Sequence, residues 1–208
     1  MLIAAIATAY LIGFPYGYVA GKVYKGVDLR QCGSGNLGAS NTLRVLGKKA
    51  GIGILIADMA KGVVIVRILP LIFCRESVMI SKELFVALVA AAGVTGHNWP
   101  VWLRFDGGKG VAITVGILLG IAPVSALCAL GMFVAVVATL KYISLGSIVL
   151  GITAPIWMWI FGRPSMYIWF GIAAGLSIIF QHRSNIKRLI RGTENKLGQQ
   201  ASSNKQQN

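Results

Sequence analysis

The sequence has few charged residues and very few acids. Charged side chains make up 12% of its 208 residues and hydrophobic ones 56%, which argues against a soluble domain, a disordered chain and a coiled coil. Six acids stand against 20 Lys and Arg, giving a net charge of +14. In a soluble protein this excess would indicate nucleic-acid binding, but in so apolar a chain it favours basic loops beside an anionic membrane face. No nucleic-acid partner is therefore expected.

Metal ligands and pairs of cysteines are also scarce. The chain has three Cys, an odd number without metal-like spacing, and only two His. Because an odd number of cysteines cannot pair fully within one chain, we expect free thiols. His97 and His182 lack an acid after four intervening residues, since Trp102 and Lys187 hold those positions. The sequence therefore predicts neither a metal site nor a sequence-local His–Asp base.

Long apolar runs dominate the chain. A membrane-spanning helix needs ~20 apolar residues, although shorter helices also cross. The candidate spans are residues 1–21, 51–74, 84–96, 112–140, 142–162 and 164–181. The run 112–140 has 29 uncharged residues. As one helix it would be ~43 Å long, beyond a bilayer core of ~30 Å. Because Pro123 lies within it, we expect two short helices there and seven crossings in all.

Basic residues set the predicted orientation of the chain. With seven crossings, 15 Lys and Arg lie on the inner side and four on the outer side, as the positive-inside rule requires. The N-terminus is then outside and the C-terminus cytoplasmic, and the fold class is an all-α polytopic membrane protein. We expect residues 1–198 to form one membrane domain and residues 199–208 a polar, flexible tail.

The first of three polar segments on the predicted cytoplasmic side covers residues 32–49. Its glycines permit tight bends and close approach to a ligand, and basic side chains follow them, so the segment suits a phosphate. A flexible basic loop lying against lipid headgroups is an equally good interpretation. The candidate ligand-binding residues are Ser34, Asn36, Gly38, Asn41 and Arg44.

The second polar segment covers residues 96–110 and ends in a glycine turn. Gly107, Gly108, Lys109 and Gly110 lead into an apolar helix, and a glycine turn with one Lys at a helix N-terminus is a second candidate anion site. The alternative is an ordinary turn with aromatic residues anchored at the lipid–water interface. A lone histidine such as His97 is more often a satisfied interfacial residue than a catalyst.

The third polar segment covers residues 181–196. His182 and Asn185 fall on one face at helical spacing, beside several basic residues. A basic stub after a last span is normal, whereas a His and an Asn together at the membrane edge are less routine. Glu194 is interpreted as a salt-bridge anchor for the basic loops, with acceptance of a substrate hydroxyl as the alternative.

Two further pairs lie in or near the predicted spans. Asp58 and Lys61 stand at i, i+3 within a span, where charges are costly and usually paired. They either pair with each other or line a polar cleft. Ser144 and Ser147 either cap a helix or contact a ligand, and capping is the more usual role for each.

Taken in order, the three segments resemble the bacterial acyl-phosphate:glycerol-3-phosphate acyltransferase family, whose members are called PlsY. The resemblance covers residues 13–196. It rests on GSGNxGAxNxxRxxGKK at 33–49, GHxxP and GGKGVA within 96–112, and HxxNIxRLxxGTExK at 182–196. Each motif alone is weak, but three in one order between matching spans are specific. The resemblance implies seven spans and cytoplasmic motifs, in agreement with the topology reached from charge.

The resemblance implies transfer of a fatty acyl group from acyl phosphate to the sn-1 hydroxyl of glycerol 3-phosphate. The products are lysophosphatidic acid and phosphate, in the first acylation of bacterial phospholipid synthesis at the cytoplasmic face of the inner membrane. No cofactor is implied, and the enzyme that makes acyl phosphate is an expected functional partner. An organic-anion channel or transporter and a non-catalytic lipid-binding scaffold are the competing classes.

The resemblance also assigns roles to the matching residues. Catalytic roles fall to His182, Asn185 and Ser34, with the leaving phosphate taking the hydroxyl proton. Structural or unassigned roles are left to Glu194, Asp58 and Lys61. The chain departs from the family at Asp106, where Lys is common, and this weakens the local positive field. Substrate-binding roles fall to Asn36, Gly38, Asn41, Arg44, Gly107, Gly108, Lys109, Gly110 and Ser144.

Overall fold

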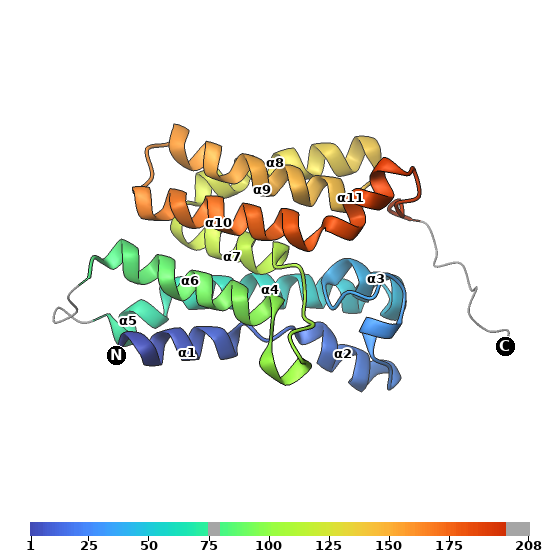
Figure 1. The fold of residues 1–208 in the computed structure, drawn as a ribbon, viewed down its shortest axis with the longest axis horizontal. Coiled ribbons are helices and arrows are strands. Elements are labelled where there is room, and N and C mark those ends of the chain that lie inside the picture. Colours follow the sequence, from blue (N-terminus) through green and yellow to red (C-terminus); the bar gives the residue numbers. More distant parts are fainter. Residues whose placement is uncertain (75–79, 199–208) are drawn as a thin grey trace, which may run out of the picture.

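The computed structural model describes residues 1–74 and 80–198, and within these ranges it is helical with no strands (Figure 1). The predicted tail 199–208 lies outside the described residues. Two 3-10 helices, η1 (Leu29–Gln31) and η2 (Val101–Leu103), accompany the α-helices. The α-helices are α1 Leu2–Ile12, α2 Tyr16–Lys25, α3 Ala39–Leu46, α4 Lys48–Arg67, α5 Leu69–Phe73, α6 Lys82–Asn98, α7 Val111–Ile121, α8 Pro123–Leu140, α9 Ile143–Ile160, α10 Ser165–Gln181 and α11 Arg183–Ile190.

Long apolar helices make this a multi-pass membrane protein. Four stretches within the described residues are long and apolar enough to cross a bilayer: Leu2–Lys25, Lys82–Leu103, Pro123–Leu140 and Ile143–Ile160. A fifth is the pair α10–α11, which is bent by 58°. We place the end of that span at Gln181, because α11 beyond the bend is strongly basic. The predicted number of seven crossings stays a prediction.

The predicted break in the run 112–140 is confirmed. Helix α7 ends at Ile121, α8 begins at Pro123, and Ala122 between them leaves the helical region with φ −149° and ψ 65°. Proline lacks the amide hydrogen that would continue α7, but it is well tolerated in the first turn of a helix, so the chain turns back here. The helix α7 that results is short and packs extensively against α4.

Small residues allow the helices to approach closely. A Cβ atom added at Gly116 in α7 would collide with the carbonyl oxygen of Met59 in α4, and one at Gly62 in α4 would collide with the carbonyl oxygen of Ile113. In a bilayer, helices gain little from burying apolar surface against each other, so close backbone packing at small residues supplies the attraction. This packing fixes α4 beside the N-terminal end of α7, where the glycine turn lies.

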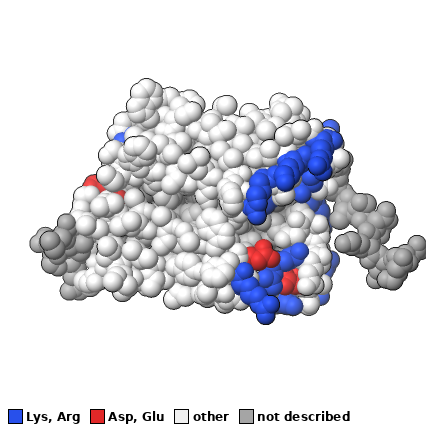
Figure 2. Space-filling view, in the orientation of Figure 1, with Lys and Arg blue, Asp and Glu red and all other residues white. Residues whose placement is uncertain are grey.

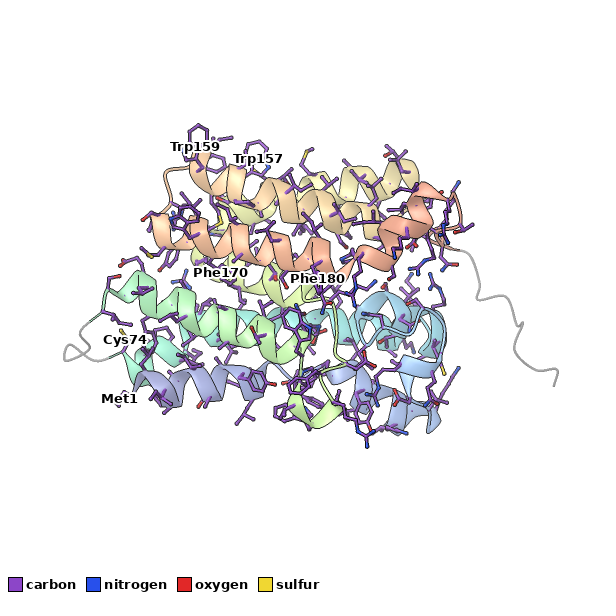
Figure 3. The ribbon with its side chains drawn as sticks, in the orientation of Figure 1. Met1, Cys74, Trp157, Trp159, Phe170 and Phe180 are labelled. Carbon is purple, nitrogen blue, oxygen red and sulfur yellow. The ribbon has the colours of Figure 1, made fainter. Side chains whose placement is uncertain are left out.

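The two ends of the bundle differ in polarity. Lys and Arg side chains gather at one end, over α11 and around α2 (Figure 2). The opposite end carries Met1, Cys74, Trp157 and Trp159 (Figure 3), and the Trp159 side chain is exposed as expected for an aromatic residue at a lipid interface. The first and third polar segments lie at the basic end, and the second, between α6 and α7, lies nearer the middle of the bundle (Figure 1).

Candidate active site

A cavity of about 460 Å³ brings residues from all three polar segments together. The structure therefore unites side chains that are up to 160 residues apart in the chain, as from Ser34 to Glu194. Gly107 and Gly108 instead line an adjoining polar pocket of about 260 Å³, which shares Ser34, Asn36 and Lys109 with the larger cavity. The predicted site residues that line the larger cavity are Ser34, Asn36, Gly38, Arg44, Asp58, Lys109, Gly110, Ser144, His182, Asn185 and Glu194.

The first glycine loop is held from within by the Asn41 side chain. Its Oδ1 accepts a hydrogen bond from the Ser34 amide (2.8 Å). The two N–H groups of its Nδ2 are shared among the carbonyl oxygens of Leu29 (3.1 Å), Cys32 (3.0 Å) and Asn36 (2.8 Å). Asn41 is fully buried and does not line the cavity. The polar atoms of Asn41 are used to fold the loop that presents Ser34 and Asn36, and its predicted contact with substrate stays a prediction.

Arg44 follows this loop on α3 and lines the cavity. Among the described residues, no carboxylate pairs with its guanidinium, whereas Arg30 and Arg188 both have carboxylate partners. Arg44 therefore carries a positive charge that is not neutralised by the surrounding protein. A guanidinium in this position suits a phosphate group, which it can bind with two parallel hydrogen bonds.

The second glycine loop is held from outside, by the end of α6. The Gly107 amide donates to the carbonyl oxygen of Asn98 (3.2 Å), and the Gly108 amide donates to that of His97 (2.9 Å). Gly110 adopts a left-handed conformation (φ 76°) and is the N-cap of α7. Because the first amides of a helix have no intrahelical acceptor, the start of α7 offers hydrogen-bond donors and partial positive charge to an anion.

Lys109 points from this loop toward the third segment, where its Nζ donates to Oδ1 of Asn185. Burial, and then the nearby Arg188, lower the pKa of Lys109 from 10.5 to about 8. The ammonium is thus still mainly charged at pH 7 but is poorly solvated. An incoming anion would supply the counter-charge that the site lacks.

His182 lies at the bend between α10 and α11. Its Nδ1 is 2.8 Å from the carbonyl oxygen of Ile178, which can only accept, so Nδ1 carries the ring proton and Nε2 offers a lone pair. Burial, and then the charge of Lys109, lower the pKa of His182 to about 4. The imidazole is therefore neutral at pH 7 and acts as a hydrogen-bond acceptor at Nε2.

Glu194 ties the third segment to α9. Its carboxylate accepts hydrogen bonds from Ser144 Oγ (2.9 Å), Asn185 Nδ2 (2.6 Å) and Arg188 Nε (2.7 Å). Burial alone would raise the pKa of Glu194, but the hydrogen bonds from Asn185, Arg188 and Ser144 hold it below its usual value. This geometry favours the anchor interpretation over the hydroxyl-acceptor one. Ser144 is held in the same network while it faces the cavity.

The remainder of the cavity wall is apolar. It is formed by α4, α7, α8 and α9, so the cavity runs from basic and amide groups to aliphatic and aromatic side chains. Such a lining suits an amphiphile with an anionic head. The apolar wall residues are Leu55, Met59, Val111, Ala112, Val115, Leu130, Phe133, Ile143 and Leu150.

The fold and the cavity define a multi-pass membrane protein with a cavity that is basic and polar on one side and apolar on the other. Residues 3–192 match the family model described as glycerol-3-phosphate acyltransferase. The chain belongs to this family of membrane acyltransferases of lipid biosynthesis.

Curated relatives and solved structures resemble the chain over nearly its whole length. Glycerol-3-phosphate acyltransferases of Synechococcus elongatus and Desulforamulus reducens are 43% and 40% identical, over 99% and 93% of this chain and 100% and 94% of their own. The crystal structure of PlsY, an integral membrane glycerol 3-phosphate acyltransferase, in its glycerol 3-phosphate form has a TM-score of 0.87 at 35% identity, covering 95% of this chain and 96% of that one. Its lysophosphatidic acid form has a TM-score of 0.84 at 34% identity, with 95% of each chain covered.

Proposed function

We propose that this protein acylates glycerol 3-phosphate to lysophosphatidic acid. The observation that carries the proposal is the cavity in which two glycine loops, both histidines and a basic helix meet an apolar wall. Solved relatives are described in a glycerol 3-phosphate form and a lysophosphatidic acid form, the acceptor and the product of this reaction.

The proposed donor is a fatty acyl phosphate and the proposed acceptor atom is the sn-1 hydroxyl oxygen. The hydroxyl oxygen attacks the acyl carbonyl carbon, a new ester C–O bond forms, and the C–O bond to phosphate breaks. The departing phosphate takes the hydroxyl proton. An acyl phosphate is already an activated mixed anhydride, so the protein needs mainly to hold two anions and align them.

In this mechanism the two loops hold different phosphates. Lys109 and the glycine turn before α7 bind the phosphate of glycerol 3-phosphate, whereas Ser34, the first glycine loop and Arg44 bind that of the acyl phosphate. The acyl chain lies against the apolar wall between α7, α8 and α9. Both loops line the cavity, the first with Ser34, Asn36 and Gly38 and the second with Lys109 and Gly110, which supports two phosphate positions within one site.

His182 aligns the attacking hydroxyl in this proposal. Its Nε2 lone pair accepts the hydroxyl hydrogen bond, because Nδ1–H is already given to Ile178. With a pKa of about 4 the imidazole is a weak base at pH 7, so it holds the hydroxyl without deprotonating it. The hydroxyl hydrogen turns from Nε2 to the leaving phosphate as the new C–O bond forms. Asn185, held by Lys109 and Glu194, orients the same region.

The proposed setting is the inner membrane of a bacterium, with one membrane domain, the N-terminus outside and the cavity open to the cytoplasm. The concentration of Lys and Arg at the cavity end of the bundle supports this orientation (Figure 2). The enzyme that makes acyl phosphate is the proposed functional partner.

A donor comparison tests the proposal. The protein purified in lipid is supplied with glycerol 3-phosphate and one of three donors: palmitoyl phosphate, palmitoyl-CoA or the palmitoyl thioester of acyl carrier protein. We expect lysophosphatidic acid and one equivalent of phosphate only from acyl phosphate. A thioester that works equally well would refute the donor assignment, and absence of lysophosphatidic acid from every donor would refute the function.

A further inference from the structure

A buried polar cluster of Asp58, Lys61 and His97 lies beside the second glycine loop, outside the machinery described above. The three residues are 1%, 4% and 2% exposed. Lys61 Nζ is 2.8 Å from Asp58 Oδ1 and 3.0 Å from His97 Nδ1, and it donates to the carbonyl oxygens of Gly13 and Phe14, each at 2.8 Å. The sequence left open whether Asp58 and Lys61 pair or line a cleft. They pair, and Asp58 also lines the cavity.

This cluster determines which nitrogen of His97 carries the ring proton. The ion pair with Asp58 keeps Lys61 as an ammonium, which has only donors. We assign Lys61 as the donor and His97 Nδ1 as the acceptor of this contact, which places the proton of the neutral ring on Nε2. Without the ammonium, either tautomer would be open to the ring.

The Nε2–H group of His97 faces the second glycine loop. A Cβ atom added at Gly108 would collide with His97 Nε2, so the imidazole edge occupies the space that a side chain would take in this loop. Among the described residues, no hydrogen bond uses this nitrogen, although the ring is 98% buried and lines the cavity with Lys109 and Gly110. A donor that faces a cavity without a protein partner is available to a ligand.

We propose that His97 Nε2–H binds the phosphate of glycerol 3-phosphate as a third donor beside the Lys109 ammonium and the first amides of α7. The inference rests on the proposed function, and it gives the Asp58–Lys61 pair a purpose, which is to hold His97 as a donor. The opposite tautomer would place a lone pair against the anion and repel it. His97 is thus a substrate-binding residue, and Lys61 and Asp58 are positioning residues.

Two substitutions of His97 separate this role from a structural one. In His97→Gln, the amide nitrogen can reach the position of Nε2 and replace the donor to phosphate. In His97→Asn, the amide oxygen can reach the position of Nδ1 and accept from Lys61, but nothing replaces the donor at Nε2. The measurements are KM for glycerol 3-phosphate, the inhibition constant of inorganic phosphate, KM for acyl phosphate, and thermal stability in detergent.

We expect His97→Asn to raise KM for glycerol 3-phosphate about tenfold, the loss expected for one hydrogen bond to a charged group. Its KM for acyl phosphate and its melting temperature should stay near the wild-type values. His97→Gln should keep KM for glycerol 3-phosphate within about threefold while losing thermal stability. The reverse order, with Asn near wild type and Gln impaired, would show that His97 serves only Lys61, and equal rises of KM in both would also overturn the proposal.

A measurement on the wild-type protein covers the case in which either variant fails to fold. The chain has only two histidines, so protein labelled with ¹⁵N-histidine gives the signals of only two imidazole rings, with Nδ1 and Nε2 of each. One ring should show an Nε2–H proton that shifts when glycerol 3-phosphate is added. An Nδ1–H tautomer for both rings, or no shift at saturating ligand, would contradict the inference. Lysophosphatidic acid production by the same wild-type sample tests the proposed function separately.

Discussion

The two histidines of this protein are buried at similar positions but in opposite hydrogen-bond states. His97 lies at the end of α6 and His182 at the end of α10, and both line the same cavity. At His97, Nδ1 accepts from Lys61, which leaves Nε2 as a donor. At His182, Nδ1 donates to the carbonyl of Ile178, which leaves Nε2 as an acceptor. One residue type thus provides a donor suited to a phosphate and an acceptor suited to a hydroxyl, and the partner of Nδ1 decides which.

The largest expected effect comes from His182, the histidine whose Nε2 is a hydrogen-bond acceptor. His182→Ala removes the group that aligns the attacking hydroxyl, and we expect kcat to fall about 100-fold or more, in the range seen for lost preorganised contacts. Matched melting temperatures would show that the fold is intact. Turnover within a few-fold of wild type in a folded His182→Ala protein would remove His182 from the mechanism.

The next largest effect comes from Glu194, which holds the polar residues around His182 in place. Glu194→Gln weakens a carboxylate that holds Ser144, Asn185 and Arg188, so we expect kcat to fall about tenfold and the melting temperature to drop. Because the pKa of Glu194 is lowered in the fold, its contribution to stability is full above the pKa of the unfolded chain. It is lost as pH falls through the lower, folded value.

Thermal unfolding at several pH values checks the Glu194 prediction. The difference in melting temperature between wild type and Glu194→Gln should be largest near neutral pH and should shrink below about pH 4, where the carboxyl protonates in the unfolded chain while it is still charged in the fold. A difference that is constant from pH 7 to pH 3 would show that the carboxylate charge is not what stabilises the segment.

Lys109, which lies beside the His97 hydrogen-bond donor in the proposed phosphate site, titrates in the alkaline range. With a pKa of about 8, Lys109 loses its charge as pH rises, so KM for glycerol 3-phosphate should increase by up to about tenfold per pH unit above that value. In Lys109→Arg the cation persists and the rise should disappear, even if the basal KM differs. Initial rates between pH 7 and pH 9.5 test this prediction, with the hydrolysis of acyl phosphate measured in parallel. A wild-type KM that stays flat across this range would contradict the prediction.

The smallest expected effect concerns Asp106, at the edge of the polar pocket beside Lys109. Its side chain is largely exposed and lies 3.9 Å from Arg30. Asp106→Asn removes a negative charge from the approach of an anion, so we expect KM for glycerol 3-phosphate to fall about twofold at low salt and not at high salt. A drop that persists at high salt would indicate a structural change instead of a charge effect.

Local sequence signals were sufficient for much of the architecture. The turn at Pro123 follows from the length of an apolar run and the chemistry of proline, both visible within 29 residues. The glycine turn ahead of α7 is equally local. The convergence of the three segments follows from topology, because apolar runs of bilayer length bring alternate loops to the same side.

The parts that the sequence does not reveal depend on distant partners. His97 looked like an ordinary interfacial residue, since its partner Lys61 is 36 residues away. Asn41 looked like a ligand-binding side chain, and only the fold of the loop shows that Leu29, Cys32 and Asn36 occupy its polar atoms. Polar residues near a cavity can face the ligand or the backbone, and the sequence pattern is the same for both.

The hydrogen bonds from Lys61 to the backbone between α1 and α2 limit where the N-terminal part of the protein can be lengthened. The carbonyl groups of Gly13 and Phe14 meet the ammonium only at one rotation of α1. One residue inserted within α1 would turn the following backbone by about 100° and withdraw both carbonyls. Tags and reporters fused before Leu2 leave this rotation intact. Lengthening α1 itself would withdraw the two carbonyls from Lys61 and so disturb the proposed phosphate contact of His97, more than 80 positions downstream.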